Sequence, residues 1–355
     1  MDLPENVILE LTYRCNHRCK FCSCPWDAPS SGYEKGAELT LSQWKEAIDR
    51  LYLSGFKYFS ISGGEAFIRT DWEEIVRHIH LRGIDYGLDN PIVLISNGRL
   101  MSDDKLRSLK ELGVHLSMSL PGYETFEWHT GVDNADNVLE WFGKAHEIGL
   151  HVTANIAVTK KNLPELFETM ALALINGADD ILLNRFLPGG RGLQYMSDLC
   201  LDVAEINKML DIAEEVLERA GRTGYTGTEI PYCAIDDPQK YKHINIGYRC
   251  GAAQGFMVVD PVGQIRVCNH SPKTVGNIFD PLMIRDTEYW NLFNKRNYQP
   301  EECGLCMANK FCDCGCREVA AILSNSPSAV DCSVELKYRH CYEKKVLHKA
   351  KTEVK

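Results

Sequence analysis

Short apolar runs alternate with longer segments of helical period along the first two thirds of the chain. The runs predict six strands, at residues 7–13, 58–62, 92–96, 115–120, 151–158 and 181–186. Six helices are predicted over residues 44–52, 72–82, 103–112, 135–148, 163–176 and 202–220, each closed by a glycine within three residues. Strand–helix units of this length predict a parallel sheet with right-handed crossovers. Because six units cannot close an eightfold barrel, we expect an α/β fold with a partial, TIM-like (β/α)6 barrel.

The pattern changes after Gly221. Residues 222–249 are rich in turn-forming residues and have no clear helical or strand period. Residues 256–267 predict a β-hairpin that turns at Asp260–Gly263, and we expect the cysteine-dense stretch beyond it to be mostly irregular. This change places a domain boundary near residue 225, with domains at 1–225 and 226–355.

Polar and glycine-rich segments follow most of the predicted barrel strands. They lie at residues 15–24, 63–65, 97–98, 121–122 and 188–190. In a parallel sheet the carboxyl ends of the strands share one edge, and chemistry is usually found there. We therefore expect the functional site at these strand ends.

Composition and charge narrow the class of protein. Of the 355 residues 45% are hydrophobic and 25% are charged, which is typical of a globular protein and excludes a disordered chain. The net charge is −10, from 39 basic and 49 acidic residues, so we expect no nucleic-acid partner. The chain has no apolar run of roughly 18 residues and no signal-peptide pattern at its start. We therefore expect a cytoplasmic protein with no membrane contact.

The 15 cysteines are clustered. Four lie between Cys15 and Cys24, and five lie between Cys303 and Cys316. The overall content is below the roughly 8–10% of a small disulfide scaffold, and cysteines of a large intracellular protein are more often metal ligands. The distribution predicts two separate metal regions.

The first cluster places Cys15, Cys19 and Cys22 directly after the first predicted strand. Three thiolates on one loop suit a 4Fe–4S cluster in which one iron stays open to another ligand. Zinc is the alternative, and Cys24 would then supply the fourth ligand that a structural zinc site requires.

This Cys-x3-Cys-x2-Cys loop resembles that of the radical S-adenosylmethionine (radical SAM) superfamily. In that family the open iron binds SAM, and reduction yields methionine and a 5′-deoxyadenosyl radical. Ser62-Gly63-Gly64-Glu65 is similar to the family motif that holds the methionine amino group. Glycines allow close backbone approach, and we expect the Glu65 carboxylate to accept from the ammonium group.

The resemblance implies further SAM contacts at the strand ends. Phe21 matches an aromatic position that touches adenine, although a core aromatic is the alternative. The family usually has Ser-Leu-Asp-Gly where this chain reads Ser119-Leu-Pro-Gly122, so we assign no catalytic acid or base. The other implied contacts are Ser96, Asn97, Ser117, Ser119, Asn155 and Arg185. For Asn155 and Arg185, a purely structural hydrogen-bonding role is an equal alternative.

The second cysteine region resembles the SPASM pattern of seven cysteines, which binds two auxiliary 4Fe–4S clusters. The resemblance assigns Cys250, Cys268 and Cys316 to the first of them, whose fourth position is either open or filled by Cys233. It assigns the second to Cys303, Cys306, Cys312 and Cys332, with Cys341 as an alternative to Cys332. A pair of zinc knuckles is the competing interpretation. Five cysteines remain unassigned, as hydrogen donors, extra ligands or small buried apolar residues: Cys24, Cys200, Cys233, Cys314 and Cys341.

The resemblance implies a radical SAM enzyme with three 4Fe–4S clusters that modifies a peptide or protein, as in the maturation of ribosomal peptide products. An external electron donor would be needed. Because the first strand begins near residue 7, we expect a separate leader-recognition protein. Oxidation of a small molecule, or of one protein residue as in sulfatase maturation, is the alternative. A non-catalytic electron-transfer protein is a third class, against which Gly63-Gly64-Glu65 argues.

Overall fold

A computed structural model describes residues 2–331, apart from 30–31, 34, 89–91 and 305. All six predicted strands and all six predicted helices are present. The first strand ends three residues early, because the chain leaves the sheet there to form the cysteine loop. The strands are β1 (Asn6–Glu10), β2 (Tyr58–Ser62), β3 (Ile92–Ser96), β4 (Val114–Ser119), β5 (Val152–Val158) and β6 (Asp180–Arg185). The helices are α1 (Leu41–Leu53), α2 (Trp72–Asp85), α3 (Asp103–Glu111), α5 (Ala135–Glu147), α6 (Leu166–Ile175) and α8 (Val203–Ala220).

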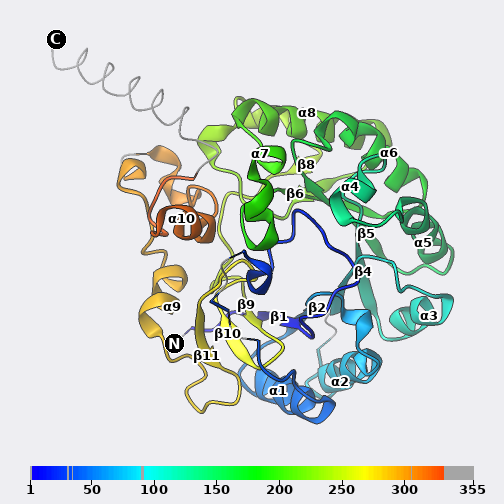
Figure 1. The fold of residues 1–355 in the computed structure, drawn as a ribbon, viewed down its shortest axis with the longest axis vertical. Coiled ribbons are helices and arrows are strands. Elements are labelled where there is room, and N and C mark those ends of the chain that lie inside the picture. Colours follow the sequence, from blue (N-terminus) through cyan, green and yellow to red (C-terminus); the bar gives the residue numbers. More distant parts are fainter. Residues whose placement is uncertain (1, 30–31, 34, 89–91, 305, 332–355) are drawn as a thin grey trace.

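One sheet of 11 strands runs through the molecule in the order β11-β10-β9-β1-β2-β3-β4-β5-β6-β7-β8. Strands β1 to β8 pair in parallel, and β9 (Phe256–Val259) pairs in parallel with β1. β10 (Gln264–Arg266) returns antiparallel to β9, which confirms the predicted hairpin, and β11 (Thr274–Asn277) follows. Figure 1 shows the six long helices around the outside of the curved sheet. The expected partial barrel is therefore confirmed.

Burial explains why these segments form strands and helices. In β3 buried positions alternate with half-buried ones, and Leu94 at its centre is fully buried. In α1 the buried residues Trp44, Ala47, Ile48 and Leu51 recur at helical spacing. The predicted capping box is present, since the Thr40 hydroxyl accepts from the amide of Gln43 and the Gln43 side chain accepts from the amide of Thr40.

Several short elements were not predicted. The segment without a clear period contains β7 (Gly224–Thr226) and β8 (Ile244–Asn245). Short helices α4 (Phe126–Thr130) and α7 (Met196–Leu199) precede α5 and α8. Two helices, α9 (Thr287–Asn294) and α10 (Arg317–Ser324), interrupt the stretch that we expected to be mostly irregular. Strands of two or three residues are too short to show a period.

The sheet therefore continues on both sides of residue 225, and a domain division at that residue remains a prediction. Because β1 to β6 are parallel, their carboxyl ends share one end of the barrel, where the cysteine loop also lies. Among the described residues, the structure contains no helix with the length and apolar character to cross a membrane.

Candidate active site

The predicted three-thiol loop lines a cavity at the strand ends. Cys15, Cys19 and Cys22 bound a cavity of about 220 Å³ together with Gly63, Gly64, Glu65, Ser96, Asn97 and Ser119. The loop is pinned from outside, because the amides of Arg18 and Lys20 donate to carbonyls in the last turn of α4, at 2.9 and 2.7 Å. The structure thus brings together the sulfur donors and most of the predicted SAM contacts.

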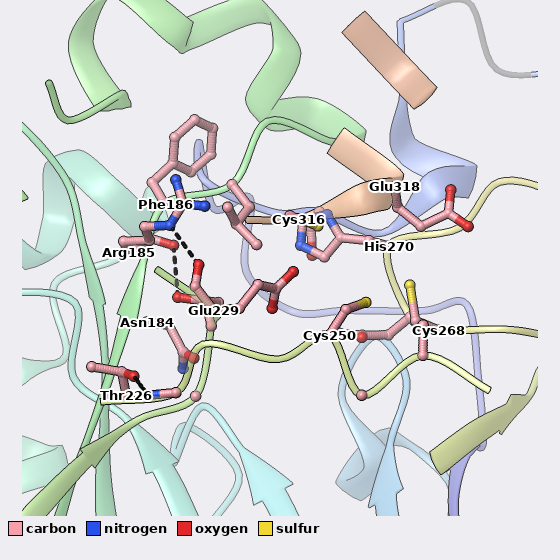
Figure 2. Close-up of a pocket in the computed structure, with 18 of the residues that line it drawn as sticks. Asn184, Arg185, Phe186, Thr226, Glu229, Cys250, Cys268, His270, Cys316 and Glu318 are labelled. Atoms are coloured by element: carbon pink, nitrogen blue, oxygen red, sulfur yellow. Dashed lines mark hydrogen bonds between the residues drawn. The ribbon is translucent and has the colours of Figure 1, made fainter. Parts of the chain in front are cut away.

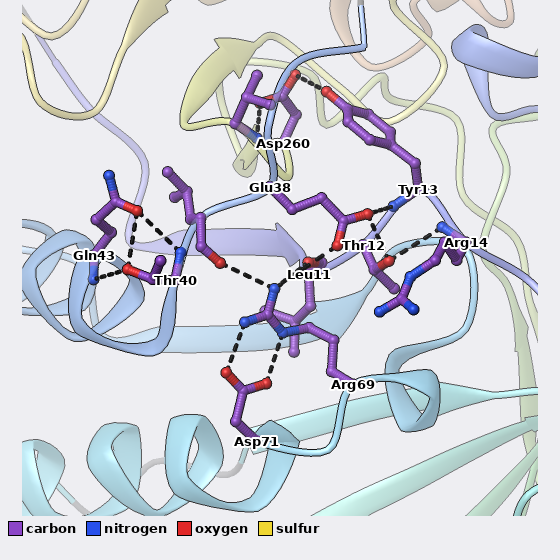
Figure 3. Close-up of polar contacts among 12 residues, drawn as sticks. Leu11, Thr12, Tyr13, Arg14, Glu38, Thr40, Gln43, Arg69, Asp71 and Asp260 are labelled. Atoms are coloured by element: carbon purple, nitrogen blue, oxygen red, sulfur yellow. Dashed lines mark hydrogen bonds and ion pairs between the residues drawn. The ribbon is translucent and has the colours of Figure 1, made fainter.

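The end of β1 is held firmly where the loop begins. The Glu38 carboxylate accepts from the Thr12 hydroxyl at 2.8 Å and from the Tyr13 amide at 2.9 Å (Figure 3). The Arg69 guanidinium, paired with Asp71 at 2.7 Å, donates to the carbonyl of Leu11 at 3.3 Å. These contacts give the thiol loop a fixed starting point.

The backbone of Gly63 and Gly64 packs directly against the backbone of the residues that lead into the cysteine loop. The Gly64 amide donates to the Thr12 carbonyl at 2.7 Å, and the Glu65 amide donates to the Arg14 carbonyl at 2.9 Å. A Cβ added at Gly64 would lie 2.1 Å from the Arg14 carbonyl oxygen. Gly63 has a φ of +137°, which favours glycine. Only glycines allow this close contact.

The Glu65 carboxylate joins the ends of β2 and β3. It is 2% exposed and accepts from the Ser96 hydroxyl at 3.0 Å, the Asn97 amide at 2.9 Å and the Phe67 amide at 3.2 Å. Burial raises the pKa of Glu65, and these hydrogen bonds oppose that rise. The carboxylate therefore positions the Ser96–Asn97 turn, and its contact with the SAM ammonium group stays a prediction.

The remaining predicted contacts divide into three groups. Phe21 and Ser119 line both this cavity and the larger one next to it. Asn155 lines only the larger cavity and accepts from the Asn184 amide nitrogen at 2.8 Å. Ser117 lines neither cavity, and its buried hydroxyl has no hydrogen-bond partner among the described residues. All four assignments stay predictions.

A cavity of about 450 Å³ separates the barrel strand ends from the cysteine-rich segment (Figure 2). It shares Phe21, Ser23, Ser119 and Asn269 with the thiol-loop cavity, so the two adjoin. Its wall contains all three thiols assigned to the first auxiliary cluster, and polar residues that the sequence did not indicate. The walls include Cys250, Cys268 and Cys316 and the unpredicted Asn184, Thr226, Glu229, His270 and Glu318.

Two buried ion pairs hold this second wall against the barrel. Arg266 on β10 pairs with Glu10 on β1, and its guanidinium donates to the carbonyls of Asn269 and Ser271 at 3.1 and 2.9 Å. Arg185 on β6 pairs with Asp331 at 2.7 Å, so this predicted contact residue also has a structural role. The pairs fix the segments that carry Cys268 and Cys316.

The second group of cysteine thiols also converges. The Cys314 side chain hydrogen-bonds with those of Cys303 and Cys312, although the seven-cysteine pattern leaves Cys314 out. Cys314 has a φ of +63°, a conformation that is uncommon for a non-glycine residue. Cys306 belongs to the same turn, since its amide donates to the Cys303 carbonyl at 2.9 Å. Cys332 and Cys341 lie outside the described residues.

Cys24 is the unassigned cysteine beside the first loop, and its thiol hydrogen-bonds with that of Cys22. Within the described ranges, no three His, Cys, Asp or Glu side chains are grouped so as to hold a single metal ion. Three soft sulfur donors on one loop, lining a cavity together with Gly63, Gly64 and Glu65, fit a 4Fe–4S cluster with a bound cofactor.

Known proteins are similar to this chain in sequence and in fold. The profile of the radical SAM superfamily matches residues 9–173. The AdoMet-dependent heme synthase of Methanosarcina barkeri is 30% identical over 336 residues, 89% of this chain and 92% of that protein. The PqqA peptide cyclase of Bradyrhizobium diazoefficiens is 26% identical over 354 residues, 95% of this chain and 88% of that protein.

The structure of Streptococcus suis SuiB bound to S-adenosylmethionine has a TM-score of 0.70 against this chain at 17% identity, and covers 94% of this chain and 78% of that one. That likeness shows the shared fold. The range that the profile matches contains both the three-thiol loop and the Gly63-Gly64-Glu65 turn. The chain therefore belongs to the radical SAM superfamily of enzymes.

Proposed function

We propose that this enzyme uses a 5′-deoxyadenosyl radical to abstract hydrogen from a peptide substrate and so modifies it after translation. The observation that carries the proposal is the pair of adjoining cavities, which share Phe21, Ser23, Ser119 and Asn269. A substrate in the larger cavity would lie next to the thiol loop. The names of two similar proteins support a peptide, since one is a peptide cyclase and SuiB was solved with its precursor peptide SuiA.

The residues around the thiol-loop cavity have separate roles in this proposal. Cys15, Cys19 and Cys22 would hold the 4Fe–4S cluster that, once reduced, supplies the radical from bound SAM. Gly63 and Gly64 allow the residues after β2 to pack against the backbone that leads into the thiol loop, and Glu65 fixes the Ser96–Asn97 turn beside it. Phe21 lines both cavities, where its aromatic ring would help to exclude water from the reacting groups.

Two auxiliary 4Fe–4S clusters are part of the proposal. Cys250, Cys268 and Cys316 would hold the first and Cys303, Cys306, Cys312 and Cys332 the second. The wall shared by the first three thiols and the contact between Cys303, Cys312 and Cys314 support two separate sites. Such clusters could accept the electron that an oxidised substrate radical loses. The need for reduced thiols favours a cytoplasmic location and an external electron donor.

Replacing Cys15, Cys19 and Cys22 together by alanine tests the radical chemistry. We expect no formation of 5′-deoxyadenosine, while about eight iron atoms per chain remain in the two auxiliary clusters, against about twelve in the parent. Formation of 5′-deoxyadenosine at the parent rate would contradict the assignment of the loop.

Candidate precursor peptides, each with deuterium at the reacting positions and with or without small neighbouring proteins, test the substrate class. We expect deuterium to move from peptide to 5′-deoxyadenosine and the peptide mass to change. The similarity to a heme synthase over 92% of its length favours a small-molecule substrate as the second candidate. Deuterium transfer from a small metabolite, with none from any peptide, would replace the first proposal by the second.

A further inference from the structure

Two carboxylates line the larger cavity with the three thiols, those of Glu229 and Glu318. The Glu318 carboxylate accepts from the Tyr289 hydroxyl at 2.9 Å, and its charge acts on Cys268 alone among the three thiols. Glu229 follows β7 and lines this cavity with Cys250, Cys268 and Cys316, and Figure 2 shows its side chain extending from the barrel side toward Cys316. Its carboxylate is within hydrogen-bonding reach of the Cys316 thiol, and it is close enough to Cys250 for their charges to interact. Glu229 is therefore the carboxylate that interacts with two of the three thiols lining this cavity.

A single clamp holds Glu229 and Cys316 in place. The Arg185 guanidinium donates to the Glu229 carbonyl at 3.0 Å and pairs with Asp331 at 2.7 Å. The same Asp331 carboxylate accepts from the Cys316 amide at 3.0 Å. Arg185 and Asp331 are both buried, so their ion pair fixes the two segments relative to each other.

The other two thiols are also held by buried polar contacts. The Cys250 amide donates to the Asp313 carboxylate at 2.8 Å, and Arg266 holds the carbonyls that follow Cys268. Cys233 is the cysteine that the sequence offered for the fourth position. It lies outside the wall of this cavity, and the amide of the adjacent Tyr232 donates to Cys312 of the other thiol group, at 3.4 Å.

We propose that the Glu229 carboxylate is the fourth protein ligand of the first auxiliary cluster, completing Cys250, Cys268 and Cys316. This inference rests on the proposed function, because it requires an auxiliary cluster at these thiols. Carboxylate oxygen is a harder ligand than thiolate and binds iron in other protein sites. The first auxiliary cluster would then be closed in the resting enzyme by a ligand that a thiol or a substrate group can displace.

The test uses the Cys15/Cys19/Cys22→Ala background, in which only the auxiliary clusters contribute iron. Glu229→Ala, Glu229→Cys, Cys233→Ala and Glu318→Gln, which changes the second carboxylate of the cavity, are each compared with that parent. Iron content, electron paramagnetic resonance (EPR) spectra, midpoint potential and the spectral response to added cyanide are measured on the reduced, anaerobically reconstituted proteins.

We expect Glu229→Ala to change the spectrum and potential of one cluster and to make that cluster respond to cyanide. The Glu229→Cys protein should resist cyanide as the parent does, because a thiolate can take the same position. Cys233→Ala and Glu318→Gln should keep the parental cyanide response. A parental spectrum and cyanide response in Glu229→Ala, or a cyanide response in Cys233→Ala or in Glu318→Gln, would overturn the inference. A parent with no auxiliary iron would instead overturn the cluster count of the proposed function.

Discussion

The Gly64→Ala substitution tests whether the backbone of the thiol loop must pack directly against the residues that follow β2. The new Cβ would lie 2.1 Å from the Arg14 carbonyl oxygen, and such carbons essentially never come closer than 3.0 Å. The backbone must therefore open by about 0.9 Å, which disrupts the 2.9 Å hydrogen bond from the Glu65 amide to Arg14. A displacement of about 1 Å can cost about 100-fold in rate. We expect SAM cleavage to fall by about that factor.

The assay follows 5′-deoxyadenosine per chain in a single turnover after addition of a chemical reductant. Gly143→Ala is the matched control, because the nearest atom to its added Cβ is the Asn176 carbonyl oxygen at an ordinary 3.6 Å. We expect this control to cleave SAM at the parental rate and both variants to keep parental iron. Cleavage by Gly64→Ala at the parental rate would refute the steric argument.

Two further predictions concern stability. His129 is fully buried, and burial lowers its pKa to about 4, below the unfolded value of 6.5. The neutral ring therefore stabilises the fold above pH 6.5, and this contribution is lost as the pH falls from 6.5 toward 4. Between pH 7.5 and pH 5.5, we expect the free energy of unfolding of the parent protein to fall by about 1.3 kcal/mol more than that of His129→Gln. Denaturant unfolding at the two pH values measures this difference. An equal loss in the parent and in His129→Gln would exclude this role. Arg266→Met leaves Glu10 buried without its cation and should cost about 3–5 kcal/mol. Part of the loss should return in the Glu10→Gln/Arg266→Met double variant, and thermal unfolding of the variants would show whether it does.

The long elements were predictable because their signals are local. The capping box at Thr40 and the buried spacing in α1 involve residues within two turns of one another. Strands β7 and β8 show no comparable pattern, because they contain only three and two residues. They form because β6 offers a free edge, with Gly224 opposite Ile181 and then Ile244 opposite Gly224. When such short strands form by pairing with a distant segment, the sequence of each strand shows no hydrophobic period.

The residues of the candidate site also divide into those that local sequence motifs predict and those that only the fold brings together. The thiol loop and the Gly63-Gly64-Glu65 turn are contiguous motifs, and the parallel sheet places them together because each follows a strand. Spacing also indicated Cys250, Cys268 and Cys316, but it gave no reason to single out Glu229. The contact of Cys314 with Cys303 and Cys312 was equally absent from the seven-cysteine pattern, because that pattern records spacing and not direction.

By itself the sequence determined the strand–helix repeat, the two cysteine regions and the family, because each depends on neighbouring residues or on fixed spacings. Only the tertiary structure decided which distant groups share a cavity. Glu229 and Cys316 lie far apart in the chain, and they meet because the buried Arg185–Asp331 pair binds the backbone of both segments. Burial removes the competition of water for those polar groups, so the pairing that orders the cavity becomes favourable only once the chain has folded around it.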